Sequence, residues 1–194
     1  MEKEILYKDH IINIVFDNSA ESPRDWECNL STMVCFHGRY NLGDKNHGYK
    51  VKDYDGWAEM LIAIGKNEGV GRNRLPIVDS LYLFDHSGIT ISTTQFDCKW
   101  DSGKIGFVFV PYKKAIEYLG TSRMNKNGAI KIRKIIQDEV TLYDEYLRDN
   151  VYGFTILDSN REEIDSCNGF IGSDHKKSGL LADAEAYINS LIKI

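Results

Sequence analysis

Apolar residues recur along the chain in two patterns, one typical of strands and the other of helices. Short alternating or continuous apolar runs predict strands at 4–17 (as one or two strands), 33–36, 81–84, 89–93, 105–110, 151–157 and 163–165. Apolar residues at three- and four-residue spacing predict helices at 56–67, 111–119, 127–149 and 182–192. The chain is therefore expected to combine helices with strands.

The connections between several predicted strands are short and carry turn-forming residues. Asp85-His86-Ser87-Gly88 separates two strands, and Trp100-Asp101-Ser102-Gly103 precedes the next one. Strands joined in this way are expected to run antiparallel, because a parallel pair needs a longer crossover. We predict an α+β fold in a single globular domain over 1–194. It would have a mostly antiparallel sheet of about five to seven strands, with the helices at 127–149 and 182–192 packed on one face.

The composition is that of an ordinary globular protein, with 42% hydrophobic and 27% charged residues. The net charge of −5 gives no broad field that attracts nucleic acid, so nucleic-acid binding is not predicted. No apolar run approaches the roughly 18–20 residues of a membrane span, and residues 1–10 lack the apolar run of a signal peptide. The scattered cysteines are expected to be reduced thiols. We therefore expect a cytoplasmic protein that does not contact a membrane.

A zinc site is the first chemical hypothesis that the residues raise. Residues with the ligand types that zinc prefers are Cys35, His37, His86 and Cys98, with Cys28 and His47 in reserve. Cys35 and His37 would share one face of a strand, since side chains alternate. The close-spaced ligand pairs of structural zinc sites are absent, however, and buried free cysteines are favoured. Neither a metal nor a cofactor is predicted.

Two further catalytic patterns are disfavoured by spacing. Asp85, His86 and Ser87 are adjacent, whereas a Ser-His-Asp relay draws its members from distant segments. They are better explained as a turn before Gly88. The glycines and basic residues at 65–74 follow a predicted helix and lack the Lys-Ser/Thr of a P-loop. This segment is expected only as a basic loop that could touch an acidic partner.

Side chains suited to recognition are densest in segments that should be loops or strand ends, including the long polar connection 37–55. The candidate binding residues are Arg24, Asp25, Trp26, His37, Arg39, Tyr40, Asp44, Asp85, His86, Trp100 and Asp101. Arg and aromatic groups could bind a polar ligand through bidentate contacts and stacking. The same residues could instead form a structural network, with Arg24 and Arg39 paired to carboxylates.

Longer motifs run through these segments. They are Ser22-Pro23-Arg24-Asp25-Trp26, Asn29-Leu30, the run 32–44 (Thr-Met-Val-Cys-Phe-His-Gly-Arg-Tyr-Asn-Leu-Gly-Asp), 81–89, 100–107, 151–154 and 165–170. With these motifs, over roughly residues 20–172, the sequence resembles a family of uncharacterised proteins encoded by phages and other mobile elements. The resemblance implies a phage setting in a bacterial host cytoplasm. By association it implies an inhibitor of host defence, of the anti-CRISPR or anti-restriction type.

Three functional hypotheses remain open at this point. The leading one is a non-catalytic phage or mobile-element protein that binds and inhibits a host defence component, a protein partner, through Arg and aromatic anchors. The first alternative is a metal-dependent enzyme acting on a nucleotide or nucleic-acid phosphodiester, with His37 or His86 as general acid or base. Its divalent cation would be held by Asp25, Asp44, Asp85 and Asp101. The second alternative is a sponge for a signalling nucleotide. The oligomeric state is not predicted.

Overall fold

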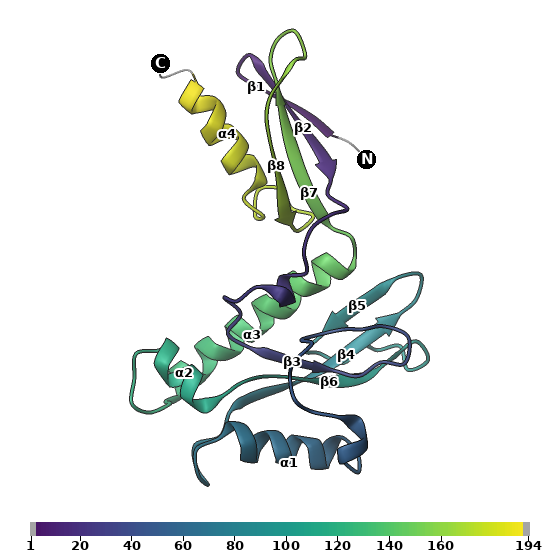
Figure 1. Ribbon diagram of the computed structural model, residues 1–194, viewed down its shortest axis with the longest axis vertical. Coiled ribbons are helices and arrows are strands. Elements are labelled where there is room, and N and C mark those ends of the chain that lie inside the picture. The colour runs from purple at the N-terminus through teal and green to yellow at the C-terminus, as the bar shows by residue number, and fades with distance from the viewer. Residues whose placement is uncertain (1–2, 192–194) are drawn as a thin grey trace. The chain divides into compact units, whose positions relative to one another are not determined.

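The computed structural model describes residues 3–191, which group into two compact units (Figure 1). Unit 1 comprises the residues up to Pro23 together with those from Glu145 onward, and unit 2 is the continuous segment Arg24–Asp144. Compact units of one chain need not fold independently. The predicted single domain over 1–194 therefore stays a prediction.

Each predicted strand and helix has a counterpart among the elements of residues 3–191, although the strands that end at Asp85, Val110 and Ile171 are longer than predicted. The strands are β1 (Lys3–Tyr7), β2 (His10–Phe16), β3 (Thr32–Cys35), β4 (Ile77–Asp85), β5 (Ile89–Ser92), β6 (Ser102–Val110), β7 (Val151–Leu157) and β8 (Glu163–Ile171). The α-helices are α1 (Trp57–Glu68), α2 (Tyr112–Tyr118), α3 (Lys126–Leu147) and α4 (Leu180–Leu191), and short 3-10 helices lie at Pro23–Asp25 and Val51–Asp53. Over this part of the chain no helix combines the length and the apolar character that crossing a membrane requires.

The strands form two sheets, and every pairing between named strands is antiparallel. Unit 1 holds the order β1-β2-β7-β8, and unit 2 holds the order β3-β6-β4-β5. The α+β class and the antiparallel pairing are therefore confirmed. Instead of one sheet of five to seven strands, residues 3–191 contain two sheets of four, because β7 pairs with the distant β2 rather than with β6.

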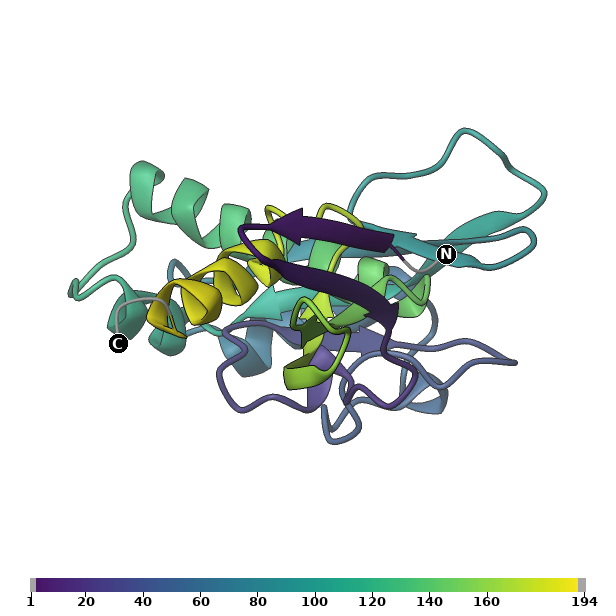
Figure 2. The ribbon, with the colours of Figure 1, turned by 90° about the horizontal axis from the view of Figure 1, so that it is seen from above.

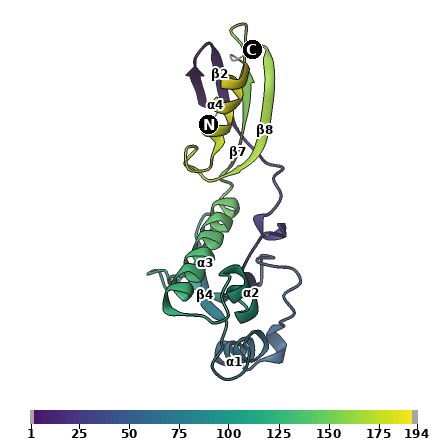
Figure 3. The ribbon, with the colours of Figure 1, turned by 90° about the vertical axis from the view of Figure 1, so that its left-hand side faces the viewer.

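Unit 1 has a core between one face of its sheet and α4. Ile12 and Ile14 of β2 share that face, since strand side chains alternate, and both are buried. They pack with Phe154 and Ile156 of β7 and with the buried stripe Leu180, Ala184 and Ile188 of α4. Figures 1 and 3 show α4 lying along this sheet. Fully burying each large apolar side chain stabilises the fold by about 1.5–3 kcal/mol.

Unit 2 has helices on both faces of its sheet. Met60 and Ile64, one turn apart on α1, pack with Phe107 and Phe109 of β6. Figures 1 and 3 show α3 on the face opposite α1. The apolar stripe of α3 is buried at Ile132, Ile136, Val140 and Tyr143. The helices predicted to share one face of one sheet thus lie on different sheets, α3 in unit 2 and α4 in unit 1.

Candidate functional site

The strand ends of the unit 2 sheet bring two predicted segments together. Phe84 of β4 pairs with Ser102 of β6, so the residues that follow one strand and precede the other are neighbours. The backbone N–H of Asp85 donates to the carbonyl of Asp101 at 2.8 Å. Figures 1 and 2 show the β4–β5 hairpin and the β5–β6 connection extending from this end of the sheet.

Two contacts between basic and acidic side chains lie at these strand ends. The guanidinium of Arg39 pairs with the carboxylate of Asp85, and Tyr40 donates its hydroxyl to the same carboxylate at 3.3 Å. His86 Nδ1 lies 3.3 Å from Asp101 Oδ2. Because the Arg39 side chain is 70% exposed, its ion pair contributes only about 0–1 kcal/mol. Arg39 therefore remains accessible to a partner.

Trp100 is the most exposed large apolar residue among those described, with 96% of its surface accessible. It directly precedes Asp101, whose carboxylate contacts His86. Exposed Trp, Arg and Tyr side chains are the residue types that most often anchor interfaces. We call the set Arg39, Tyr40, Asp85, His86, Trp100 and Asp101 the strand-end surface.

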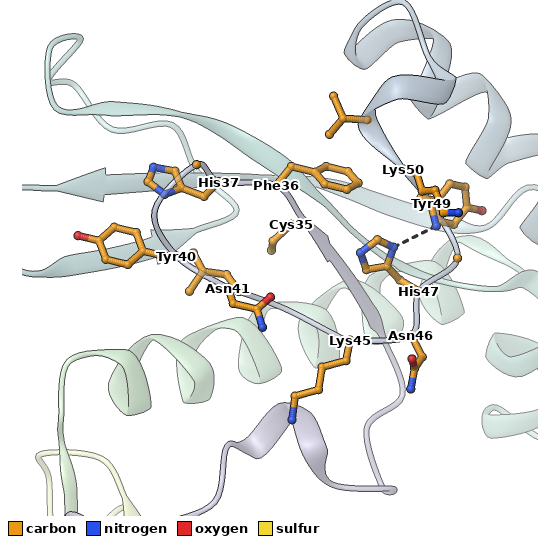
Figure 4. Close-up of a pocket in the computed structure, with 14 residues that line it drawn as sticks. Cys35, Phe36, His37, Tyr40, Asn41, Lys45, Asn46, His47, Tyr49 and Lys50 are labelled. Atoms are coloured by element: carbon orange, nitrogen blue, oxygen red, sulfur yellow. Dashed lines mark hydrogen bonds between the residues drawn. The ribbon is translucent and has the colours of Figure 1, made fainter.

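The loop that follows β3 forms an open concavity of about 970 Å³ (Figure 4). We call it the loop concavity, and its lining residues all lie between 35 and 51. Cys35 and Phe36 lie between two groups of rings, with His37 and Tyr40 on one side and His47 and Tyr49 on the other. Tyr40 belongs to both this concavity and the strand-end surface, so the two regions adjoin.

Stacked rings fix the two sides of the loop concavity. The His37 and Tyr40 rings stack at 5.0 Å with an interplanar angle of 14°, and the Arg39 guanidinium carbon lies 5.5 Å from the Tyr40 ring centre. On the other side, His47 stacks with Tyr49 at 6.4 Å, and Phe36 meets the His47 ring edge-on at 5.5 Å. Ring faces of this kind can stack with a planar ligand.

The loop concavity is basic although the protein carries a net charge of −5. Lys45 and Lys50 line it, and its lining within residues 3–191 includes no Asp or Glu. Lys45 pairs with Asp25 at 2.9 Å, whereas Lys50 makes no ion pair with any described residue. A concave surface lined by one sign of charge favours groups of the opposite sign. The concavity therefore suits an anionic group.

Burial shifts the pKa values of three groups in this loop, among them His47 and Cys35. Burial lowers the pKa of His47 and outweighs the opposing attraction of Asp44, so the ring is neutral at pH 7 and its Nδ1 accepts the Tyr49 N–H at 3.1 Å. Burial, assisted by the negative charge of Asp44, raises the pKa of the Cys35 thiol to about 12. Cys35 stays protonated and is not a nucleophile at neutral pH.

Arg24 lies in a buried network rather than on an exposed binding surface. Its side chain is 2% exposed and donates two hydrogen bonds to the carboxylate of Asp44, from Nε at 2.8 Å and from Nη2 at 3.1 Å. Nη2 also donates to the carbonyl of Ser31 at 2.8 Å. Burial alone would lower the pKa of Arg24, but its bonds to Asp44 and Glu139 outweigh burial and raise that pKa. Arg24 is permanently charged and fully engaged.

Glu139 completes this network from α3. Its carboxylate accepts the Arg24 guanidinium at 3.1 Å, the backbone N–H of Leu30 at 2.6 Å and both the N–H and the hydroxyl of Ser31. Sequence reasoning missed Glu139. The available signal was a carboxylate directly before Val140, at the edge of the apolar stripe of α3. The network thus connects two segments to α3: the residues before β3 and the part of the loop that contains Asp44.

The return of the loop toward β3 depends on Gly43. Gly43 forms an isolated antiparallel bridge with Val34, and its φ of 74° is a conformation that favours glycine. A Cβ at this position would lie 2.7 Å from the carbonyl oxygen of Met33. The hydroxyl of Tyr143 accepts the Gly43 N–H at 3.1 Å. The loop concavity is therefore held by backbone contacts as well as by the buried network.

Each carboxylate proposed for a shared cation has a basic side chain beside it instead. The pairs are Asp25 with Lys45, Asp44 with Arg24, Asp85 with Arg39 and Asp101 with His86. Within residues 3–191 no group of three or more His, Cys, Asp or Glu side chains could hold a metal ion, and all four cysteines are free. The candidate zinc ligands are likewise not assembled in this part of the chain.

Apart from Asp25 and Trp26, the predicted residues thus separate into a buried network (Arg24 and Asp44) and an exposed region (the strand-end surface and the loop concavity). Trp26 is exposed, and its carbonyl accepts a hydrogen bond from Asn29 at 2.7 Å. Sequence reasoning named the 37–55 connection, and His47 only as a reserve zinc ligand, but it missed Tyr49 and Lys50. Comparisons with family models, curated proteins and solved structures find no match to this chain. The exposed region offers cations, hydrogen-bond donors and ring faces, a set suited to non-covalent recognition.

Proposed function

We propose that this protein is a non-catalytic binding protein of a phage or mobile element that docks on a host defence protein in the bacterial cytoplasm and inhibits it. The observation that carries the proposal is the strand-end surface, where Trp100 is 96% exposed and Arg39 and Tyr40 both contact Asp85, whose backbone N–H donates to the carbonyl of Asp101. Trp, Tyr and Arg are the residues that most often dominate binding energy at protein interfaces. Exposing a Trp to water is unfavourable, and a partner that covers it removes this surface from solvent.

The setting is supported by the motifs that resemble proteins of phages and mobile elements. Several of those motif residues have no part in the core. Arg39, His86 and Trp100 all have exposed side chains. Exposed polar and aromatic residues on loops more often serve binding than folding. Other motif residues serve folding, among them the Arg24–Asp44 pair and the buried Val34, Leu81 and Phe107.

The metal-dependent enzyme is less well supported than docking. Its four carboxylates are each paired with a different basic side chain, so none converges with the others on one point. His37 is engaged in stacking on Tyr40, and its Nδ1 accepts the N–H of Arg39 at 3.3 Å. This arrangement orders the loop, and no described carboxylate contacts His37 to orient it as a catalytic imidazole. His86 does contact one, Asp101 at 3.3 Å, so the acid–base part of this alternative depends on His86.

The test combines phage plating with direct binding. The protein is expressed in bacteria that carry single defence systems, and plating of a defence-sensitive phage is measured. Purified protein is then titrated against the defence complex whose protection it relieves. Trp100→Ala and Arg39→Ala should each weaken binding about tenfold or more. Tyr118→Ala, which removes another exposed ring on α2, should bind like the wild type.

Two results would contradict docking through this surface. One is unchanged plating in every defence background together with no binding to any purified defence complex. The other is binding that survives both Trp100→Ala and Arg39→Ala, since those side chains are the proposed anchors. In the second case the protein would still be an inhibitor, but the strand-end surface would not be its interface.

A second candidate, sequestration of a signalling nucleotide, is favoured by the loop concavity. Its basic, ring-bearing lining suits a ligand with phosphate groups and planar bases. Titration calorimetry with cyclic dinucleotides and cyclic oligonucleotides tests this directly. Binding that is lost in Lys50→Glu and kept in Lys113→Glu, the same charge change on α2, would support the sponge. No heat with any cyclic nucleotide would eliminate it.

A further inference from the structure

A second surface of unit 2 has no role in the function proposed above. It is a groove of about 650 Å³ beside α1, lined by Leu61, Ile62, Gly65, Lys66, Gly71, Arg72, Leu75, Pro76, Val78 and Arg133. We call it the α1 groove. None of its lining residues lines the loop concavity or belongs to the strand-end surface. It can therefore be tested separately.

The apolar lining residues of the α1 groove, which we call its floor, include three large side chains exposed to water. Met60 and Ile64 already bury one face of α1 in the core. Leu61 and Ile62 nevertheless project from the same helix into solvent, and Ile62 is 64% exposed. Leu75, which is 56% exposed, joins them from the segment after the helix. Contiguous apolar side chains of this kind mark interaction sites more often than scattered ones do.

The basic lining residues of the α1 groove, which we call its rim, are the second part of the site. Lys66, Arg72 and Arg133 line it, and its lining within residues 3–191 includes no Asp or Glu. Arg133 is half-exposed and pairs with Asp79 at 2.9 Å. Lys66 and Arg72 make no ion pair with any described residue. The groove therefore combines an apolar floor with two cations that lack an acidic partner in this part of the chain.

The wall of the groove is fixed before any partner binds. The N–H of Val70 donates to the carbonyl of Arg74 at 2.7 Å, which closes the turn that carries Arg72. Gly69 ends the helix where a Cβ would lie 2.6 Å from the carbonyl oxygen of Gly65. A closed turn of this kind lowers the entropy lost when a partner is bound.

We propose that the α1 groove binds a protein segment that carries acidic side chains next to apolar ones. The apolar floor would accept the apolar side chains, and Lys66 and Arg72 would pair with the carboxylates. A concave site accepts a ridge of side chains, as in helix-in-groove recognition, more readily than it accepts a flat bilayer. The partner is thus an acidic amphipathic segment of another protein.

A synthetic peptide provides the direct test on the full-length chain. The probe is a fluorescein-labelled amphipathic helix with leucines along one face and glutamates beside them, and fluorescence anisotropy measures its binding. A matched peptide with lysines in place of the glutamates reports the contribution of charge. The glutamate peptide should bind at least about tenfold more tightly, and added salt should weaken its binding.

Variants test whether the glutamate peptide binds in the α1 groove. Ile62→Glu and Arg72→Glu should each weaken the glutamate peptide about tenfold or more, the first through the floor and the second through the rim. Ile130→Glu, at another exposed isoleucine, and Lys113→Glu, at an exposed lysine of α2, are the matched controls and should bind as the wild type does. All four positions are exposed, so a circular dichroism spectrum like that of the wild type is expected for each.

Four results would overturn the proposal. Equal affinity for the two peptides would show that charge complementarity does not contribute. Equal affinity of Ile62→Glu and Ile130→Glu for the glutamate peptide would show that the peptide binds elsewhere. Two related measurements address other occupants. If Ile62→Glu converts a dimer to a monomer in sedimentation, the groove is occupied by a second copy of the chain. If the chain co-sediments with phosphatidylglycerol vesicles through Ile62, a lipid surface is the occupant. None of these results depends on whether the strand-end surface binds a defence protein.

Discussion

At the scale of single residues, Arg24 connects three parts of unit 2 that lie far apart in the sequence. It donates hydrogen bonds to Asp44 in the loop after β3, to Ser31 before β3 and to Glu139 on α3. Both carboxylates are largely shielded from water, with exposed side-chain fractions of 21% and 15%. Removing the guanidinium would leave these charges without their partner, a strongly unfavourable situation.

Arg24→Ala is therefore expected to lower the free energy of unfolding by about 3–5 kcal/mol. Urea denaturation followed by circular dichroism measures the change. Arg39→Ala is the matched control, because it removes an exposed Arg from an exposed ion pair, and it should cost about 1 kcal/mol or less. A loss for Arg24→Ala no greater than that for Arg39→Ala would show that the network does not hold the loop.

His47 predicts how stability depends on pH. Burial lowers its pKa below the usual 6.5, so the unfolded chain takes up a proton on this ring at a higher pH than the folded chain. The contribution to stability is complete above about pH 6.5 and is lost as the pH falls below it. Protonation would also remove the Nδ1 acceptor of the Tyr49 N–H. We expect a slope below the limit of about 1.4 kcal/mol per pH unit, since solvent screens the half-buried ring.

Urea denaturation between about pH 5 and 8 measures this slope. His47→Asn places an amide oxygen near the position of Nδ1 and should flatten the curve below about pH 6.5. His175 in unit 1 also has a pKa lowered by burial, assisted by the positive charge of Lys3, so His175→Asn should flatten the curve in the same direction. An unchanged slope in the His47→Asn variant would assign the pH dependence to other groups.

At the scale of elements, periodicity predicted where strands and helices lie but not which strands pair. α3 was predictable from its apolar stripe, and β2 from its alternating isoleucines. β8 was predicted only over 163–165, because most of its residues up to Ile171 are exposed and show no apolar pattern. This strand is defined by its hydrogen bonds to β7, and such pairing leaves little trace in the sequence of an exposed strand.

In the candidate site, too, some features could be predicted from the sequence and others could not. The turn residues at 85–88 and 100–103 predicted that Asp85 and Asp101 lie near strand ends. Local turn chemistry was sufficient for that inference. The Arg24–Glu139 contact joins residues 115 positions apart, and no local pattern encodes it. Exposure was also unpredictable, since Arg24 and Arg39 have the same chemistry and opposite environments.

Gly106 provides a prediction at the scale of the sheet. In β6 it faces β3 so closely that a Cβ would lie 1.8 Å from the carbonyl oxygen of Val34. Gly106→Ala must move one strand away from the other and is expected to lower the free energy of unfolding by about 3 kcal/mol. Gly103→Ala lies on the same strand with no atom within 4 Å, and it should cost less than about 1 kcal/mol. Equal unfolding midpoints in urea would show that β3 and β6 are not packed this closely.

At the scale of the whole molecule, the two compact units differ in continuity. Unit 2 is one uninterrupted segment, whereas unit 1 joins the first strands to the elements after α3. Each unit has its own antiparallel sheet and its own buried cluster. The strand-end surface, the loop concavity and the α1 groove are all made by residues of unit 2. All the recognition chemistry discussed above is thus confined to a continuous stretch of chain.

We therefore expect residues 24–147, which extend unit 2 to the end of α3, to fold without the rest of the chain. The cluster of Val34, Met60, Ile64, Phe107 and Phe109 would remain intact, because all its buried members lie within this segment. Cooperative thermal unfolding and dispersed amide NMR signals that overlay those of the full chain are the expected result. The same fragment with Gly106→Ala should be unfolded or much less stable. If the unmodified fragment is itself unfolded, the two units depend on each other for stability, and the chain is the single cooperative domain that its length suggests.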